Sequence, residues 1–123
     1  MSENLMARRR AALGERHYFV QGEPAKAYWH NFSKGPLDKL ISRYGDEVNL
    51  VILGSPELEK DFYILPWSQV RYLYRDELLQ TGKKKRWVGK VNDHELIYHK
   101  KGCQPAALDI TEFYGLTDLA RQM

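Results

Sequence analysis

The strongest structural constraint in this 123-residue chain is a pair of short alternating segments in its second half. Arg86 to Val91 and His94 to Lys100 read as two short β-strands, because residues two apart share a face and one face of each segment is apolar while the other carries charge. The residues between them, Asn92 and Asp93, tolerate the positive φ of a two-residue hairpin turn. The pattern therefore predicts an antiparallel hairpin with one apolar face and one charged face.

A turn at Asn92-Asp93 also predicts which residues pair across the hairpin. It places Trp87 opposite Tyr98, and at the open end it places Lys85 opposite Lys100. The residues expected to anchor the hairpin to the core are Trp87, Val91, Leu96 and Tyr98, and those expected to face outward are Arg86, Lys90 and His99.

Positive charge is concentrated in the segment from Thr81 to Gly102, which contains the hairpin. It holds seven Lys/Arg and two acidic residues, a local charge of +5 against +3 for the whole chain. The rest of the chain, with 12 Lys/Arg and 14 Asp/Glu, is slightly acidic. Such a cluster favours a polyanionic partner, above all nucleic acid. Two alternatives remain open: an acidic protein partner, and lysines that protect a solvated sheet edge from aggregation.

Duplex DNA is the favoured ligand, because a two-stranded ribbon fits the major groove and the lysines can contact phosphates. Arg71 and Arg75 lie four residues apart on a predicted helix, where they could clamp two neighbouring phosphates. The alternative is that Arg75 pairs locally with Asp76, Glu77 or another surface acid. The predicted nucleic-acid-binding residues are Lys83, Lys84, Lys85, Arg86, Lys90, His99, Lys100, Lys101, Arg71 and Arg75.

Two helices are indicated in the middle of the chain. Pro36 suits the first turn of one helix, and Gly45 follows its last apolar residue as a stop. Pro66 ends a strand and lets Ser68 open the other helix. Its predicted buried residues are Val70, Leu73, Tyr74 and Leu78.

Further strands are predicted from runs rich in β-branched and aromatic residues. Glu47 to Leu53 and Asp61 to Trp67 are two such runs, and the short polar loop between them favours antiparallel pairing. Ala107 to Ile110 is a shorter candidate strand. Helical patterns are read at Glu3 to Arg16 and Thr117 to Met123. The spacing of apolar residues from Pro24 to Phe32 favours a helix, and the aromatic content of this segment would also suit a strand.

These elements predict a single α+β domain over residues 1–123, with a mainly helical part at 1–45 and a sheet core with one helix at 46–115. The sheet is expected to be curved and mainly antiparallel, or an open pseudobarrel with flanking helices. The lone Cys103, the absence of a long apolar run and the arginines in the N-terminal segment predict a cytoplasmic protein without a membrane span.

No catalytic motif, metal site or cofactor site is recognised in the sequence. The four histidines share no ligand spacing, and no glycine-rich phosphate loop or nucleophile elbow is present. A metal-dependent nuclease subunit using Asp46, Glu47, Glu59 and Asp61 is kept as the alternative from the enzyme class.

Five aromatic residues are candidates for stacking on an unpaired or flipped base, since every base presents a π face. The competing interpretation is that they belong to the core, where aromatic residues at regular spacing are commonly found. The candidates are Tyr28, Trp29, Phe32, Trp67 and Trp87.

The order of elements in the second half of the chain resembles that of the B3-like and PUA-like pseudobarrel domains of restriction and related DNA-processing enzymes. The order consists of the segment DFYILPW, a helix, the segment RWVGKV, a hairpin and the closing segment DITEFYG. The resemblance covers Glu47 to Gly115 and rests on element order and aromatic positions, so no contact residue is carried over. It implies a recognition domain that reads DNA through loops and strands, in some families including a modified or flipped base. Catalysis would then belong to a separate domain or subunit.

Overall fold

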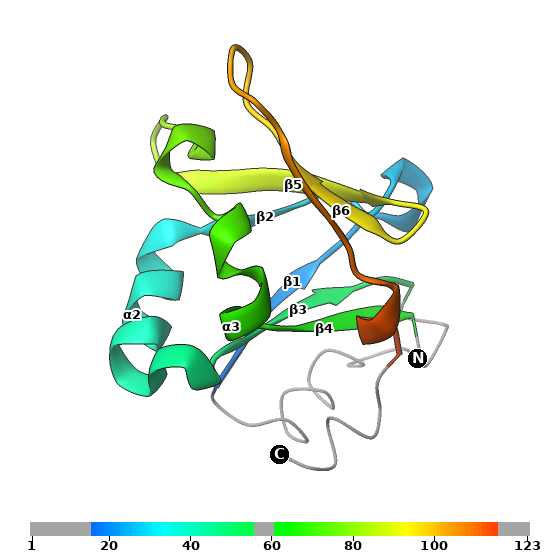
Figure 1. The fold of residues 1–123 in the computed structure, drawn as a ribbon, viewed down its shortest axis with the longest axis horizontal. Coiled ribbons are helices and arrows are strands. Elements are labelled where there is room, and N and C mark those ends of the chain that lie inside the picture. The colour runs from blue at the N-terminus through cyan, green and yellow to red at the C-terminus, as the bar shows by residue number, and fades with distance from the viewer. Residues whose placement is uncertain (1–15, 56–60, 116–123) are drawn as a thin grey trace.

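Two β-sheets packed face to face form the framework of the protein (Figure 1). The computed structural model of the chain describes residues 16–55 and 61–115. The first sheet has the order β1-β3-β4, with β1 parallel to β3 and β3 antiparallel to β4. Its strands are β1 (His17–Gln21), β3 (Asn49–Leu53) and β4 (Phe62–Pro66).

The second sheet is antiparallel throughout and has the order β2-β5-β6-β7. The predicted hairpin forms its centre, so each hairpin strand has a neighbour on both sides. The strands are β2 (His30–Ser33), β5 (Arg86–Asn92), β6 (Glu95–Tyr98) and β7 (Ala106–Asp109). The predicted α+β class and mainly antiparallel pairing are confirmed, but the described strands form two sheets and no closed barrel.

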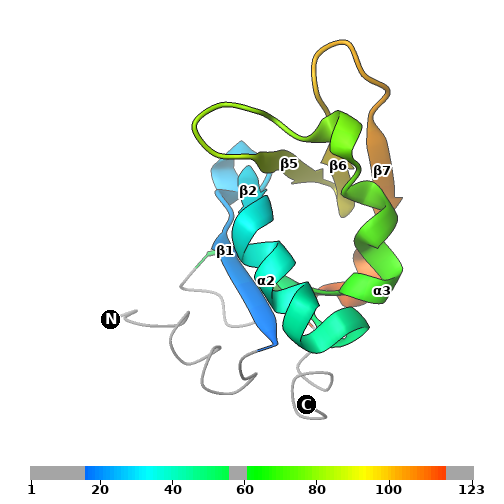
Figure 2. The ribbon, with the colours of Figure 1, turned by 90° about the vertical axis from the view of Figure 1, so that its left-hand side faces the viewer.

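Two α-helices, α2 (Lys34–Tyr44) and α3 (Trp67–Val70), lie on the same side of the molecule, beside the space between the sheets (Figure 2). The stop predicted at Gly45 is confirmed, because this residue caps α2 with a φ of +61°. No helix in the described ranges has the length and apolar character required to cross a bilayer. The short 3₁₀ turns are η1 (Pro24–Lys26), η2 (Gly45–Glu47), η3 (Arg71–Leu73), η4 (Asp76–Leu78) and η5 (Thr111–Phe113).

The main core lies between the two sheets. All five residues of β3 are buried, so this strand has apolar neighbours on both faces, which explains its unbroken apolar run. The main cluster combines residues such as Leu50 and Leu65 from the first sheet with Phe32 and Leu96 from the second. On the opposite face of the first sheet a second buried cluster contains Phe19, Val51, Leu53, Phe62 and Ile64.

The hairpin turn lies one residue later than the sequence predicts. Asp93 and His94 form the turn with φ values of 53° and 66°, and Asn92 pairs with Glu95. The predicted pairing of Trp87 with Tyr98 is therefore wrong, because Tyr98 lies opposite Gly89. The pairing is displaced by two residues, an even number, so every side chain keeps its predicted face. The predicted buried anchors, Trp87, Val91, Leu96 and Tyr98, are confirmed.

Close packing between Tyr98 and Gly89 explains this register. A β-carbon built on Gly89 would lie 2.5 Å from Cε1 of Tyr98 and 2.9 Å from the carbonyl oxygen of Ile97. Only glycine leaves room for the ring at this position. The same register leaves Lys85 and Lys100 outside the β5–β6 ladder, so the predicted row of opposed lysines does not form.

The helix predicted from Pro24 to Phe32 is wrong. The 3₁₀ turn η1 is followed by positive φ values at Ala27 and Tyr28, and the chain then enters β2. The strand β1 was not predicted, and its parallel pairing with β3 adds a third strand to the first sheet. The helical patterns at Glu3 to Arg16 and Thr117 to Met123 lie outside the described residues, apart from Arg16, which is in a turn.

The helix predicted from Ser68 is broken into α3, η3 and η4. Its predicted apolar face is nevertheless confirmed, because Val70, Leu73, Tyr74 and Leu78 are all buried. The indole Nε1 of Trp87 donates a hydrogen bond of 2.9 Å to the carbonyl oxygen of Arg75, which replaces a helical partner at the break.

We predict that Gly89→Ala destabilises the protein by about 1–3 kcal/mol, because the added methyl group overlaps the Tyr98 ring and the Ile97 carbonyl. Urea unfolding measures the difference. The matched control is Gly35→Ala, since a β-carbon there has no neighbour within 4 Å. That change should be neutral or stabilising by up to about 1 kcal/mol. Equal stability of the two variants would contradict the packing argument.

Candidate functional site

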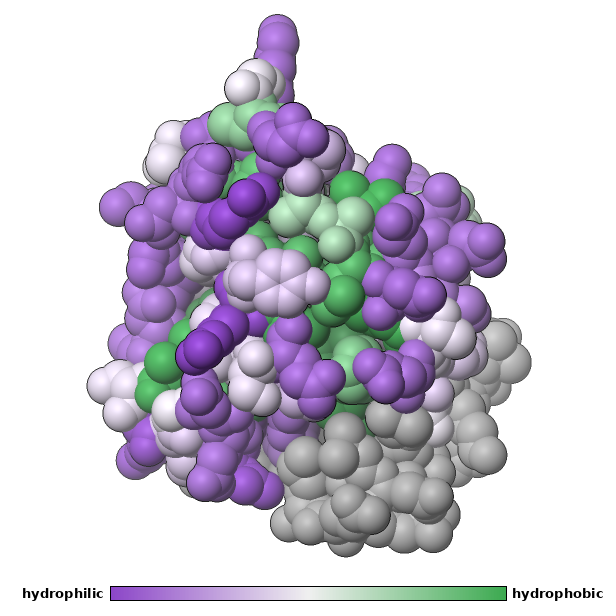
Figure 3. Space-filling model, in the orientation of Figure 1, coloured by the Kyte–Doolittle hydropathy of each residue, from purple (hydrophilic) through white to green (hydrophobic). Residues whose placement is uncertain are grey.

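Two loops rich in lysine project from the open end of the central hairpin, and we call them the basic loops. They are residues 81–85, before β5, and residues 100–105, after β6. Figures 1 and 2 place both loops at the same end of the molecule. Figure 3 shows a hydrophilic surface on the tip that projects furthest. The loops carry Lys83, Lys84, Lys85, Lys100 and Lys101, of which only Lys100 is partly buried.

The cations of the basic segment have no acidic partner within the described chain, a property that they share with Lys39, Arg43 and Arg75. Arg16, Lys26, Lys34 and Arg71 each form an ion pair with a carboxylate. Among the described residues, no carboxylate lies within 4.0 Å of any of the seven Lys/Arg of Thr81 to Gly102. Lys100 donates to the carbonyl oxygen of Leu79 at 3.0 Å, which leaves its charge uncompensated. The open end of the hairpin therefore carries concentrated positive charge.

The strand-borne candidates divide between the two ends of the hairpin. Arg86 and His99 are exposed and adjoin the basic loops. Lys90 is partly buried and lies roughly 13 Å further along β5, at about 3.3 Å per residue. Because β2 and β7 flank the hairpin, it is not the free two-stranded ribbon that was expected to enter a major groove.

Arg71 and Arg75 are engaged separately instead of forming a joint phosphate clamp. Arg71 pairs with Asp46 at 3.5 Å. Arg75 donates through Nη2 to the carbonyl oxygen of Gln104 at 3.2 Å. This contact connects the loop after β6 to the segment between η3 and η4.

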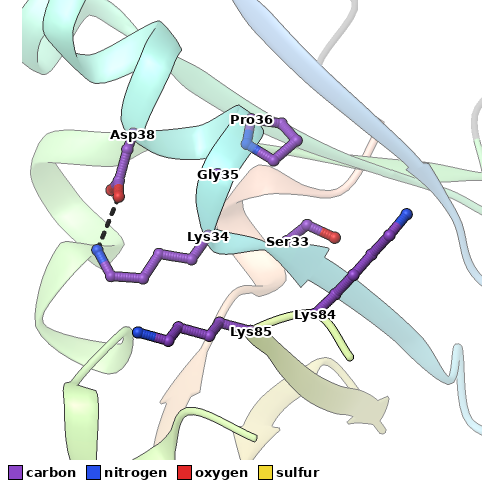
Figure 4. A pocket seen from close by; sticks show the side chains of 7 residues that line it. All are labelled: Ser33, Lys34, Gly35, Pro36, Asp38, Lys84 and Lys85. Atoms are coloured by element: carbon purple, nitrogen blue, oxygen red, sulfur yellow. Dashed lines mark hydrogen bonds and ion pairs between the residues drawn. The ribbon is translucent and has the colours of Figure 1, made fainter. Parts of the chain in front are cut away.

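An open pocket of about 420 Å³ lies between the first basic loop and the start of α2 (Figure 4). The backbone N–H of Lys34 donates to the carbonyl oxygen of Lys85 at 2.9 Å, which joins the loop to the helix. Nζ of Lys34 lies 2.7 Å from a carboxylate oxygen of Asp38. Lys34 was not among the predicted residues, because the sequence shows it only as part of a helix start. The pocket is lined by Ser33, Lys34, Gly35, Pro36, Asp38, Lys84 and Lys85.

A buried carboxylate organises the opposite end of the hairpin. Asp61 is 3% exposed and accepts hydrogen bonds from the hydroxyl groups of Tyr28 and Tyr114, the latter at 2.9 Å. Its other oxygen accepts from the backbone N–H of Ser55 at 2.7 Å. We call the group formed by Tyr28, Asp61, Tyr63, His94 and Tyr114 the Asp61 cluster.

The rest of this cluster joins the hairpin turn to the first sheet. The hydroxyl of Tyr63 lies 2.6 Å from Nδ1 of His94, and the rings of Tyr63 and Tyr114 are 4.9 Å apart. The described non-glycine residues with positive φ lie in the two turns that supply Tyr28 and His94. Sequence reasoning missed the cluster, because its members are far apart in the chain and follow no motif.

The tyrosines of the cluster act as hydrogen-bond donors. Burial, followed by the adjacent Asp61 carboxylate, raises the pKa of Tyr28 and of Tyr114 above the usual range. Both phenols donate hydrogen bonds that satisfy the carboxylate. The arrangement holds separate segments together.

The three described residues of the nuclease alternative are not assembled into a site. Asp46 pairs with Arg71, Glu47 pairs with Arg16, and Asp61 lies in its own cluster. Glu59 lies outside the described residues. Within residues 16–55 and 61–115, no three His, Cys, Asp or Glu side chains are grouped closely enough to hold a metal ion.

The stacking candidates lie mostly in the core. Phe32 and Trp87 are buried, and Trp67 packs partly buried against the same cluster. Tyr28 is engaged with Asp61. Trp29, at 42% exposure, is the one of the five whose ring is largely open to solvent.

Comparison with protein-family models, with curated proteins and with solved structures finds no match for this chain.

A second buried polar group crosses the core close to the Asp61 cluster. Nδ1 of His30 lies 2.7 Å from the carbonyl oxygen of Tyr28, so this nitrogen carries the proton. Nε2 then accepts from the hydroxyl of Tyr98 at 2.8 Å, and Tyr98 accepts from Tyr74 at 2.7 Å. Burial lowers the pKa of His30 to about 4, so the ring is neutral in the folded protein.

We predict that folding loses about 3 kcal/mol of stability as the pH falls from 6.5 to 4 because of His30. In this range the unfolded chain takes up a proton that the folded state excludes, so the contribution is complete above pH 6.5. Urea unfolding at pH 7.5 and pH 4.5 should show a smaller pH difference for His30→Gln than for the wild type. The control His99→Gln changes an exposed ring and should keep the wild-type difference. An unchanged pH difference in His30→Gln would contradict this assignment.

Proposed function

We propose that the chain is a DNA-binding module whose affinity comes from contacts between its basic loops and the phosphate backbone. The observation that carries the proposal is the concentration of unpaired cations at the open end of the hairpin. Lysines without acidic partners can replace the counterions that surround DNA, and the release of those counterions drives association. Lys34, at the start of α2, extends the same positive surface beside Lys85.

The position of the lysines argues against the edge-protection alternative. Lysines that prevent aggregation belong on the outer strands of a sheet. Here β5 and β6 are the two central strands, and Lys83, Lys84 and Lys85 precede β5 in a loop. Protection of an open edge therefore does not explain why positive charge accumulates at these positions.

The flanking strands favour contacts along the phosphate backbone over deep insertion of the hairpin into a groove. The basic loops project at one end, where Arg86 and His99 adjoin them. Lys90, further along β5, would contact DNA only if the duplex also lay across the outer face of the sheet.

The proposal includes the kinship with B3-like and PUA-like recognition domains that the sequence suggests. Two packed sheets with a helix pair on one side are compatible with an open pseudobarrel. A module of this kind in a restriction-type system would depend on a separate catalytic domain or subunit.

We predict that the double charge reversal Lys84→Glu/Lys85→Glu weakens binding to duplex DNA by roughly 10- to 100-fold at 0.1 M salt, because two attractive contacts become repulsive. Fluorescence anisotropy with a labelled duplex measures the change. The matched control is Lys39→Glu/Arg43→Glu, which alters the net charge equally at exposed positions of α2. The control should bind within about threefold of the wild type.

Equal losses in the two double variants would mean that only net charge matters, and would contradict a site at the basic loops. Absence of duplex binding by the wild type would favour an acidic protein partner instead. The nuclease alternative is checked in the same samples, since it requires cleavage of the duplex when magnesium or manganese is added.

A further inference from the structure

We infer that the pocket beside the first basic loop binds a phosphate monoester, such as the 5′-phosphate at the end of a nucleic-acid strand. The inference rests on the proposed function for the lysines the two sites share, Lys84 and Lys85. It adds phosphate monoesters as a ligand class, because binding to the nucleic-acid backbone alone requires only the phosphodiester groups inside a strand.

The charge of the pocket matches a monoester. Lys34, Lys84 and Lys85 contribute three positive charges and Asp38 one negative charge, so the lining carries +2 (3 − 1). A phosphate monoester carries about −1.5 to −2 at pH 7, whereas a backbone diester carries only about −1. A monoester therefore compensates the pocket, while a diester leaves about one positive charge unpaired.

The lysines of the pocket come from two chain segments. Figure 4 shows the side chains of Lys34 and Lys85 extending to one side of Ser33 and that of Lys84 extending to the other. The hydrogen bond from the Lys34 N–H to the Lys85 carbonyl fixes the loop against α2. The backbone of the two segments is thus joined before a ligand arrives, which lowers the entropic cost of binding.

The ion pair with Asp38 prepares Lys34 for this role. The carboxylate of Asp38 accepts a hydrogen bond from the ammonium group, which orients the Lys34 side chain and raises its pKa. The same carboxylate limits the positive charge of the pocket. Its removal should therefore strengthen the binding of an anion.

The size of the pocket suits a terminal nucleotide. Its volume of about 420 Å³ falls within the range of small-molecule sites and leaves room for the sugar attached to the phosphate. Gly35 contributes open space, because a β-carbon built there has no neighbour within 4 Å. A larger side chain at Gly35 would therefore occupy the pocket without changing its charge.

The test compares the affinity of the protein for two DNA stem-loops that are identical except that one ends in a 5′-phosphate and the other in a 5′-hydroxyl. Fluorescence anisotropy measures both affinities. We expect the wild type to bind the 5′-phosphorylated duplex about tenfold more tightly. Lys84→Gln and Gly35→Leu should reduce this preference to about onefold to threefold, and Asp38→Asn should increase it. The control Lys39→Gln, on α2 outside the pocket lining, should keep the wild-type preference.

In a second experiment, the protein is titrated with thymidine 5′-monophosphate and, separately, with thymidine, and calorimetry measures the binding. It distinguishes a strand end from a free nucleotide as the source of the monoester. If the nucleotide binds but no duplex does, the pocket assignment stands and the proposed function fails. If the wild type binds both duplexes with equal affinity, whether they end in a 5′-phosphate or a 5′-hydroxyl, the inference is overturned and the proposed function stands. A preference that persists in both Lys84→Gln and Gly35→Leu overturns the assignment to this pocket.

Discussion

The hydrogen bonds to the buried Asp61 carboxylate connect parts of the fold that the chain itself separates. Asp61 precedes β4, whereas its donors lie before β2, after β3 and after η5, at Tyr28, Ser55 and Tyr114. A buried charge is costly unless several hydrogen bonds satisfy it, so these donors are constrained to meet it. Since Tyr28 leads into the second sheet and Asp61 into the first, the carboxylate fixes the two sheets relative to each other. The contact between Tyr63 and His94 then holds the hairpin turn at the same corner.

The two ends of the hairpin consequently have different properties. The turn end is tied down by aromatic and hydrogen-bonded contacts, which gives the hairpin a rigid base. The open end carries lysines for which the described part of the fold provides no acidic partner, although it pairs cations elsewhere, as at Arg16 and Arg71. The fixed turn end and the uncompensated charge at the open end suit the recognition of a polyanion, because little ordering of the hairpin is required when the ligand binds.

The sequence predicts the parts of the fold that depend on local patterns. The helix ending at Gly45 and both faces of the hairpin are confirmed, because a glycine stop and a two-residue period depend only on residues that are close together in the sequence. The register was wrong because it depends on the packing of Tyr98 against Gly89, a contact across strands that alternation does not encode. The lysines were recognised by composition, but the pocket was not, because Lys34 reaches Lys85 only through the tertiary fold. The Asp61 cluster escaped prediction for the same reason.

Salt dependence is the most direct measurement of the central claim that the basic loops bind DNA through its phosphates. The association constant for a duplex is measured across a series of salt concentrations and plotted on logarithmic axes. Five loop lysines, Lys83, Lys84, Lys85, Lys100 and Lys101, predict a slope of about −4.5, from about −0.9 for each phosphate contact. A slope near zero would contradict binding through the phosphate backbone.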